Sequence, residues 1–323
     1  MRDDLNYKFL VADLAGIETR VAGWLSGCEA LMKVFQDGRD PYSDLAAKMY
    51  GIPYDRLWAD YKGKNGKERQ IAAKQMRQVA KPGILGAVYG LGGGGWGLSK
   101  DGDKIKTGMF GYASAMQVEM SQEQAHQVVR IFRDSYPEIP AFWKLLEDAV
   151  ADVMRGTNTV RRLGPNGCIT IDKLIVNDDR EIMRMQLPSK RYLHYIDARL
   201  ESCLMPWKNP ETGGAVYREN LVYAGINQDT KQWDTWVQTR GSKLFENLDQ
   251  AISRDILGAK LLEIESYDMP IVAHVHDEGV ALVPDDLFSF GVDKTVEIMS
   301  KEVDFCPGLL LGADGFESPF YRK

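Results

Sequence analysis

Short apolar blocks alternate with amphipathic segments along the chain, and this pattern predicts a mixed α+β fold. Residues 9–13, FLVAD, predict a buried strand that ends in an aspartate, and residues 17–25, IETRVAGWL, predict the helix that follows. Short amphipathic helices are expected over residues 28–62, around the turn DGRDPYSD. The N-terminal region therefore predicts a strand-to-helix corner that leads into a helical region.

The pattern is less regular in the middle of the chain. Residues 62–81 hold seven lysines and arginines and lead into a predicted helix that runs toward Tyr89 and the loop YGLGGGGWG. Residues 121–155 predict a long helix interrupted at YPEIP. Residues 157–235 are rich in Gly, Pro, Asn and β-branched residues, which predicts hairpins and loops.

Regular periodicity returns in the C-terminal region. Apolar residues recur every four positions over residues 241–265 and predict a helix with one packed face; they are Leu244, Leu248, Ile252 and Ile256. The segment IVAHVHDEGVALV, residues 271–283, predicts two buried apolar strands joined by a tight turn that carries Asp277 and Glu278.

Composition sets the class of protein. The chain has 323 residues, 44% of them hydrophobic, enough for one large domain or two intertwined ones. No apolar run approaches the roughly 18 residues of a membrane span, and acids occupy the start, so we expect a cytosolic protein with no membrane partner. The net charge of −6 requires any polyanion to meet a local basic patch. The four cysteines form no C-x-x-C pair, which predicts ordinary reduced thiols.

Two strand-end aspartates suggest a metal-dependent site. Asp13 ends the first strand and Asp277 lies in the turn of the last strand pair, so one sheet could bring them together. Facing carboxylates repel unless cations lie between them, and two Mg²⁺ ions about 3.5 to 4 Å apart are the usual solution in phosphoryl transfer. The alternative is that HDE is a solvated turn and Asp13 a helix cap.

A row of residues at spacings of four predicts one helical face about 18 Å long. This row consists of Arg77, Lys81, Leu85 and Tyr89. Two cations followed by an aromatic ring suit a triphosphate and a base. A solvated basic face that precedes a core tyrosine is the alternative.

Taken in order, DLAGIETR, R-x3-K-x7-YG and VHDE resemble motifs A, B and C of the family A, DNA polymerase I-like, DNA polymerases. Further segments resemble the phage branch of that family, namely AGWLSG, DPYSDLAAKMYG, LPSKRYLHY and GSKLFENLDQAISRDIL. The resemblance implies an antiparallel-sheet palm with a large, mostly helical fingers insertion. Residues 1–27 would form the first palm segment, residues 28–238 the fingers with a hairpin and loop insertion, and residues 239–323 the second palm segment.

The resemblance also assigns roles to the acids. Asp13 and Asp277 would be the catalytic, metal-binding aspartates for two Mg²⁺ ions, and Glu278 an accessory acid. Glu18 would stack with Tyr89 and exclude a 2′-hydroxyl.

The remaining roles concern the nucleotide and the DNA. Arg77 and Lys81 would bind the triphosphate, and Lys81 would also donate a proton to the leaving pyrophosphate. Leu85 replaces the aromatic residue that helps to discriminate among sugars. His276 and Gln250 match positions near the primer terminus and the template minor groove.

Several positions depart from the family pattern. Pro82 predicts a kink in the fingers helix, and Ala15 and Gly16 replace the more usual Ser-Gln pair. His274 matches no family role and is interpreted as a structural histidine. The loop GLGGGGWG lacks the G-K-[ST] ending of a phosphate-binding loop and is expected to be flexible.

The thumb and the exonuclease-like domain of the family are absent from the matched segments. We therefore expect the C-terminal half of a split phage replicative polymerase, whose N-terminal polypeptide supplies the thumb and the remaining palm, or else a truncated chain. Expected partners are a primed DNA template and dNTPs, in the cytoplasm of a phage-infected bacterium. A catalytically silent DNA-binding or assembly module and a two-metal nuclease are the alternatives.

Overall fold

The computed structural model describes residues 6–99, 101–177, 180–209, 211–227, 230–286 and 290–321. Two compact units divide the chain: Met1–Trp24 with Asp249–Lys323, and Leu25–Leu248. We call these units 1 and 2. The unit boundaries fall inside two helices, α1 (Ile17–Ser26) and α9 (Gly241–Glu265). The expected boundaries at residues 27/28 and 238/239 are close to these, and the names palm and fingers stay a prediction.

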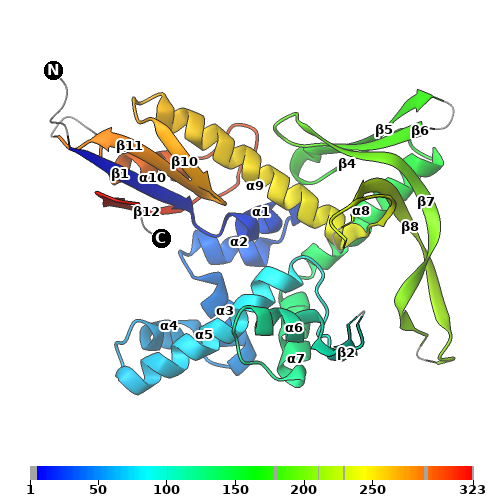
Figure 1. Cartoon of the computed structure of the whole chain (residues 1–323). Coiled ribbons are helices and arrows are strands. Elements are labelled where there is room, and N and C mark those ends of the chain that lie inside the picture. The colour runs from blue at the N-terminus through cyan, green and yellow to red at the C-terminus, as the bar shows by residue number, and fades with distance from the viewer. Residues whose placement is uncertain are drawn as a thin grey trace. The chain divides into compact units, whose positions relative to one another are not determined.

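Unit 1 is built on a four-stranded antiparallel sheet in the order β10-β11-β1-β12. Its strands are β1 (Tyr7–Leu14), β10 (Ile271–Val275), β11 (Glu278–Pro284) and β12 (Ala313–Ser318). Helix α10 (Val292–Ser300) packs against β1 and β12. The side chain of Leu261 on α9 approaches Gly279, where a Cβ atom would lie 2.6 Å from it, so α9 lies against β11. Figure 1 shows β1 between β11 and β12.

The strand pair at residues 271–283 is confirmed as a hairpin, but only one of its strands is buried. β11 is buried along most of its length, whereas the edge strand β10 exposes Val272 and His274. The expectation of two buried strands was wrong for β10, because an edge strand has a neighbour on one side only. His274 therefore lies on an exposed edge and not in a core.

The first half of unit 2 is helical, as the periodicity predicts. Its helices are α2 (Glu29–Gln36), α3 (Pro41–Tyr50), α4 (Tyr54–Tyr61), α5 (Lys67–Ala87), α6 (Gly108–Ala115), α7 (Gln122–Ser135) and α8 (Glu138–Arg155). The interruption at YPEIP is confirmed between α7 and α8. Ser121 begins α7 with a capping box, in which its side chain and that of Gln124 bond each other's backbone N–H groups.

The glycine-rich loop is followed by a short hairpin of β2 (Trp96–Leu98) and β3 (Lys104–Lys106). Gly94 has φ +74°, and a Cβ atom there would lie 2.0 Å from the carbonyl oxygen of Thr107. Glycine is required by this close approach of two backbone segments.

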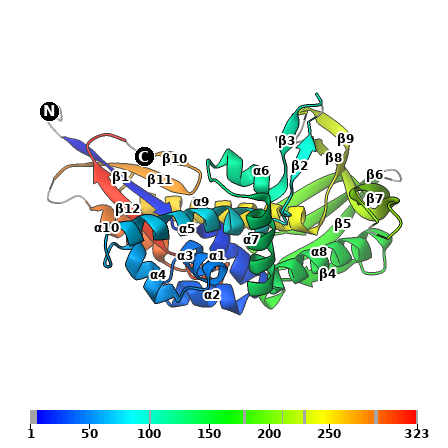
Figure 2. The same cartoon turned by 90° about the horizontal axis from the view of Figure 1, so that it is seen from below.

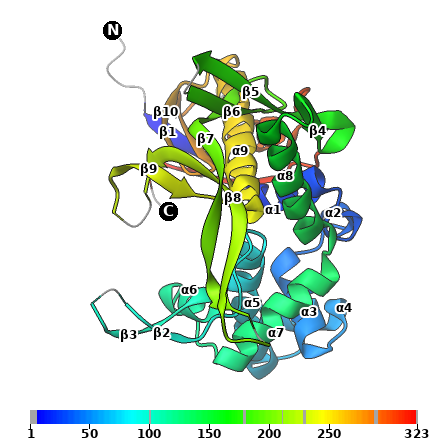
Figure 3. The ribbon, with the colours of Figure 1, turned by 90° about the vertical axis from the view of Figure 1, so that its right-hand side faces the viewer.

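The second half of unit 2 forms a six-stranded antiparallel sheet in chain order, where hairpins and loops were expected. Its strands are β4 (Val160–Leu163), β5 (Ile169–Asn177), β6 (Arg180–Gln186), β7 (Tyr192–Lys208), β8 (Ala215–Ile226) and β9 (Trp233–Gln238). The insertion is thus helical up to Arg155 and continues with the hairpins that the sequence predicts for residues 157–235. Helix α8 packs against β4, β5, β7 and β8 (Figure 2), and Figure 3 shows the long ribbon of β7 and β8.

Candidate active site

The predicted acids of unit 1 meet at the ends of three neighbouring strands. The buried residues Leu10, Val11 and Ala12 fix β1 in the sheet. The next residue, Asp13, is partly exposed. Asp13 is the register partner of Glu278 on β11. The backbone N–H of Leu14 donates to the carbonyl oxygen of Asp277 at 3.1 Å. The structure therefore brings together Asp13, Asp277 and Glu278, as the sequence predicts.

A fourth acid, Asp314, completes this carboxylate cluster and was missed from the sequence. Asp314 on β12 is the register partner of Asp13 on the side away from β11. Cross-strand partners share one face of a sheet, so Asp13, Glu278 and Asp314 lie on the same face. One sequence signal could have identified Asp314. It lies in the segment GADGF, and this segment directly follows the apolar run GLLL.

The environment of the carboxylate cluster changes the pKa values of Asp13 and of the neighbouring Tyr321. Burial raises the pKa of Asp13, and the charges of Asp277, Asp314 and Glu278 raise it further. Glu278 is only 5% exposed, and its Oε1 accepts a hydrogen bond of 2.9 Å from the hydroxyl of Tyr321. This bond to a carboxylate raises the pKa of Tyr321.

These carboxylates fit a divalent cation in charge and chemistry. Oxygen ligands suit Mg²⁺, and a bound cation would relieve the repulsion that raises the pKa of Asp13. Among the residues that the structure describes, no group of three or more acids, histidines or cysteines is close enough to hold a metal ion by itself. Mg²⁺ commonly takes one or two carboxylates together with water and substrate phosphates, so this geometry is compatible with Asp13 and Asp277 as the protein ligands.

The turn between β10 and β11 places His276 in an uncommon conformation. Its φ is +54°, it is exposed, and it occupies the first position of a two-residue hairpin loop. Glycine and asparagine are the residues that accept positive φ most readily. A histidine at this position costs some stability, which is typical of functional turns.

Arg20 fixes the corner between β1 and α1. Its Nε donates to the carbonyl oxygen of Ala15 at 2.8 Å, and its Nη1 donates to that of Leu310 at 3.0 Å. Burial lowers the pKa of Arg20, while the charge of Asp314 acts in the opposite direction. Glu18 lies partly buried in the first turn of the same helix. Arg20 was not predicted, because hydrogen bonds to backbone carbonyls leave no pattern in the sequence.

The predicted cationic face of unit 2 lies on α5. Arg77, Lys81 and Leu85 occupy this helix at spacings of four and are all partly buried. The helix is continuous across Pro82. Tyr89 lies beyond its end, in a turn where its N–H donates to the carbonyl oxygen of Gly86 at 3.2 Å. The expectation that all four residues share one helical face was therefore wrong for Tyr89.

Arg77 is held by an acid that was not predicted. Its Nε and Nη2 donate to the two carboxylate oxygens of Asp40 at 2.8 and 2.9 Å. The guanidinium also lies 4.9 Å from the ring centroid of Tyr42 and 5.3 Å from that of Tyr61. Asp40 in addition caps α3 by accepting from the N–H of Ser43. This arrangement gives Arg77 a structural role, and its triphosphate contact stays a prediction.

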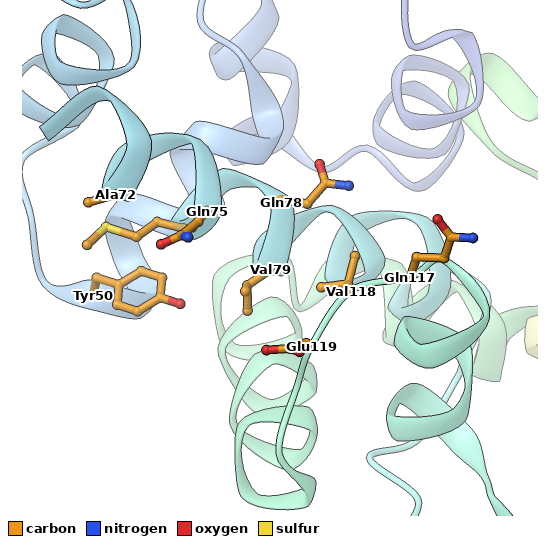
Figure 4. A pocket seen from close by; sticks show the side chains of 9 residues that line it. Tyr50, Ala72, Gln75, Gln78, Val79, Gln117, Val118 and Glu119 are labelled. Carbon is orange, nitrogen blue, oxygen red and sulfur yellow. The ribbon is translucent and has the colours of Figure 1, made fainter. Parts of the chain in front are cut away.

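A cleft of about 530 Å³ lies against α5 but does not include the predicted site residues. Figure 4 shows Gln75, Gln78 and Val79 of α5 around it, together with Val118 and Glu119 of the segment after α6. Arg77 and Lys81 do not line this cleft.

The remaining predicted residue, Gln250, is exposed on α9 in unit 1. The structure thus gathers one set of predicted residues in unit 1 and another in unit 2. The joining of the two sets into one active site stays a prediction.

Comparison with known proteins agrees with the motifs. No protein-family profile matches the chain. The DNA polymerase of Bacillus phage SP02 is 29% identical over 316 residues, which are 98% of this chain and 41% of that protein. The resemblance to family A DNA polymerases is confirmed. The thermostable DNA polymerase I of Thermus aquaticus is 26% identical over 130 residues, which are 40% of this chain and 12% of that polymerase.

The polymerase resemblance extends to the fold. The polymerase domain of Pol1 from M. smegmatis, solved in complex with DNA primer-template and dNTP, aligns with a TM-score of 0.51 and 16% identity. The alignment covers 97% of this chain and 40% of that domain. The chain therefore has the mixed helical and antiparallel-sheet fold of a polymerase domain, while spanning less than half the length of these relatives. None of the described helices is both long and apolar enough to cross a membrane.

Proposed function

We propose that the chain carries out DNA-templated DNA synthesis, in which a deoxynucleotide is transferred from a dNTP to a primer 3′-hydroxyl. The observation that carries this proposal is the carboxylate cluster, in which Asp13 and Asp277, the two motif aspartates, lie beside each other although 264 positions separate them. Similarity to a phage DNA polymerase over 98% of the chain supports it.

In this proposal Asp13 and Asp277 hold two Mg²⁺ ions, and Glu278 is an accessory acid. When bound, such ions activate the attacking hydroxyl and neutralise charge on the phosphates. Glu278 keeps its position through the hydrogen bond from Tyr321. Asp314 adds negative charge on the same face and so favours cation binding.

The residues of unit 2 would bind the nucleotide. Lys81 would contact the triphosphate and donate a proton to the leaving pyrophosphate. Arg77 would contact the triphosphate only after exchanging one or both of its hydrogen bonds with Asp40. Tyr89 and Glu18 would exclude a 2′-hydroxyl, and Leu85 would leave room beside the sugar.

Two residues of unit 1 would contact the DNA. His276, presented by the β10–β11 turn, would meet the primer terminus, and Gln250 of α9 would meet the template minor groove. Partners in this proposal are a primed template and dNTPs. We further propose that a second polypeptide supplies the remaining regions of the polymerase in the cytoplasm of a phage-infected bacterium. The support is that the chain spans 41% of its phage relative.

A catalytically silent DNA-binding or assembly module is the second candidate. It is favoured by the ion pair that occupies Arg77. Primer extension with Mg²⁺ and dNTPs separates the two candidates. Extension by the full chain, alone or only after addition of a complementing polymerase polypeptide, supports the proposed synthesis. Absence of extension in both mixtures, with DNA still bound, favours the silent module.

A further inference from the structure

A second cleft in unit 2 is lined by none of the predicted site residues, although Gly90 beside Tyr89 borders it, and it has an unusual charge. It measures about 820 Å³ and is bordered by α7, α8, β7, β8, β9 and the start of α9. Five cationic side chains line it: Arg133, Lys144, Arg155, Arg218 and Arg240. Only three acids do so: Glu147, Asp148 and Glu219. The cleft is therefore positive, in a chain whose net charge is −6.

The acids of this cleft already have partners. Glu219 pairs with Arg155, and Asp148 pairs with Lys144 one helical turn away. Glu147 accepts a hydrogen bond of 2.8 Å from the backbone N–H of Gly241. Two of the three acids are therefore engaged by cations of the cleft itself, and Glu147 is engaged by a backbone N–H group.

Arg133 and Arg240 are the cations without a carboxylate partner. Within the described ranges, neither makes an ion pair, and Arg240 donates only to the hydroxyl of Ser242, at 3.1 Å. Burial lowers the pKa of Arg133, and no neighbouring carboxylate raises it. Guanidinium groups that no carboxylate engages keep several N–H donors available to a ligand in the cleft.

The wall of the cleft is closely packed, so its shape is defined. A Cβ atom at Gly241 would lie 2.0 Å from the carbonyl oxygen of Trp143, and one at Gly90 would lie 2.5 Å from the side chain of Ser242. These glycines allow the turn after Tyr89, helix α8 and the start of α9 to meet closely. Trp143 lines the cleft beside the cations, and Asn220 and Gln238 add amide groups from the sheet.

We propose that this cleft binds a single strand of nucleic acid. Cations without acidic partners suit successive phosphates, an aromatic side chain suits an unpaired base, and amides suit base edges. The arginines come from α7, α8, β8 and the approach to α9, so they surround a path and do not form one exposed stripe. This inference rests on the cleft alone and does not depend on the proposed synthesis.

The test uses the full chain and a fluorescein-labelled oligo(dT) of about 16 nucleotides, a length within the usual range of single-strand sites. The probe forms no duplex, so its binding reports on an unpaired strand. Affinity is measured by fluorescence anisotropy at several salt concentrations. The test variant is Arg133→Gln/Arg240→Gln, which removes two cations without breaking an ion pair between described residues.

The matched control is Arg56→Gln/Arg130→Gln, which removes the same charge from exposed positions on α4 and α7 outside the cleft. We expect the test variant to bind about tenfold more weakly, while the control binds like the wild type. The slope of log affinity against log salt should fall by about 1.4 in the test variant, because each lost phosphate contact contributes about 0.7. The variant Arg133→Lys/Arg240→Lys should recover most of the affinity.

Three outcomes would overturn the proposal. They are no binding by the wild type, equal losses in the test and control variants, and displacement of the strand by inorganic triphosphate at concentrations that leave the ionic strength unchanged. The last result would identify a site for a free phosphate compound. Failure of primer extension would leave the binding result standing, so the two proposals are tested separately.

Discussion

Asp13 and Glu278 are register partners across the antiparallel pair of β1 and β11, and both carboxylates face the same side of the sheet. Most cross-strand pairs in sheets avoid two like charges, because such pairs are destabilising. Burial raises the pKa of Asp13, and the further negative charges of Asp277 and Asp314 raise it more. A cluster of this kind is expected where a cation is to be bound.

The first prediction concerns stability and pH. The folded pKa of Asp13 is raised above its ordinary value of 3.8, so the folded state binds its proton more tightly than the unfolded state does. Its ionisation therefore lowers stability as the pH rises from about 3.8 through the raised pKa. Asp13→Asn removes this cost and should stabilise the chain at pH 7 by less than about 1 kcal/mol, since the group is partly exposed.

Urea unfolding at pH 7 and near pH 4 measures this effect, and the gain from Asp13→Asn should shrink at the lower pH. Asp304→Asn is the control, because it makes the same chemical change at an exposed residue whose φ is not positive. A less stable Asp13→Asn variant at pH 7 would mean that the carboxylate makes a net attractive contact.

The second prediction concerns the strained turn. His276→Asn should raise the free energy of unfolding by about 0.5 to 1 kcal/mol, because asparagine accepts positive φ more readily than histidine. If His276 contacts the primer terminus, the same variant should lose affinity for primed DNA. Urea unfolding and DNA titration of one preparation test both effects. A variant that is less stable than the wild type would show that His276 is not strained.

The third prediction separates two roles of Asp40. Asp40→Asn keeps an oxygen to cap α3 but loses the ion pair with Arg77, so it should cost about 1 kcal/mol of stability. Asp40→Ala loses the cap as well and should cost about 2 kcal/mol. Unfolding curves of the two variants measure the difference. Equal costs would mean that the Ser43 N–H finds another acceptor.

Asp40→Asn also tests Arg77. If Arg77 binds a triphosphate, its release from Asp40 should tighten dNTP binding by a few-fold in a titration. Weaker binding would assign Arg77 to support of α5 alone.

The fourth prediction concerns the cysteines. Burial raises the pKa of Cys28 to about 12, so at pH 8 only about one thiol in ten thousand is ionised. Cys28 should resist iodoacetamide in the folded chain and react after unfolding in urea. Mass spectrometry of peptides locates the label. Rapid labelling of Cys28 under native conditions would show that the α2 region opens readily.

The elements of the fold that follow from local pattern could be predicted, and those that depend on distant pairing could not. The apolar block FLVA before Asp13 and the four-residue repeat around Leu248 identify β1 and α9 because burial of one face dictates them. Hairpins were expected over residues 157–235, but the extent of the β4–β9 sheet was not, since its long strands leave Leu204 and Tyr217 more than half exposed and so give no clean alternation.

Within the site, the same distinction holds. Asp13 and Asp277 were found because each ends an apolar segment within a motif. Asp314 and Asp40 were missed. Asp314 joins the carboxylate cluster through the strand register of β1 and β12, and Asp40 bonds Arg77 although 37 positions separate them in the sequence. Pairing of this kind is set by the folded backbone and leaves no local signal.

The most direct test of the account is single-nucleotide incorporation into a primed template, measured by rapid quench with Mg²⁺ and one dNTP. The wild type, Asp13→Asn, Asp277→Asn and the control Asp304→Asn would be compared, with any complementing polypeptide held constant. We expect both cluster variants to lose at least about a hundredfold in rate while still binding DNA, and the control to match the wild type. Incorporation by Asp13→Asn and Asp277→Asn at the wild-type rate would contradict the assignment of nucleotide transfer to these carboxylates.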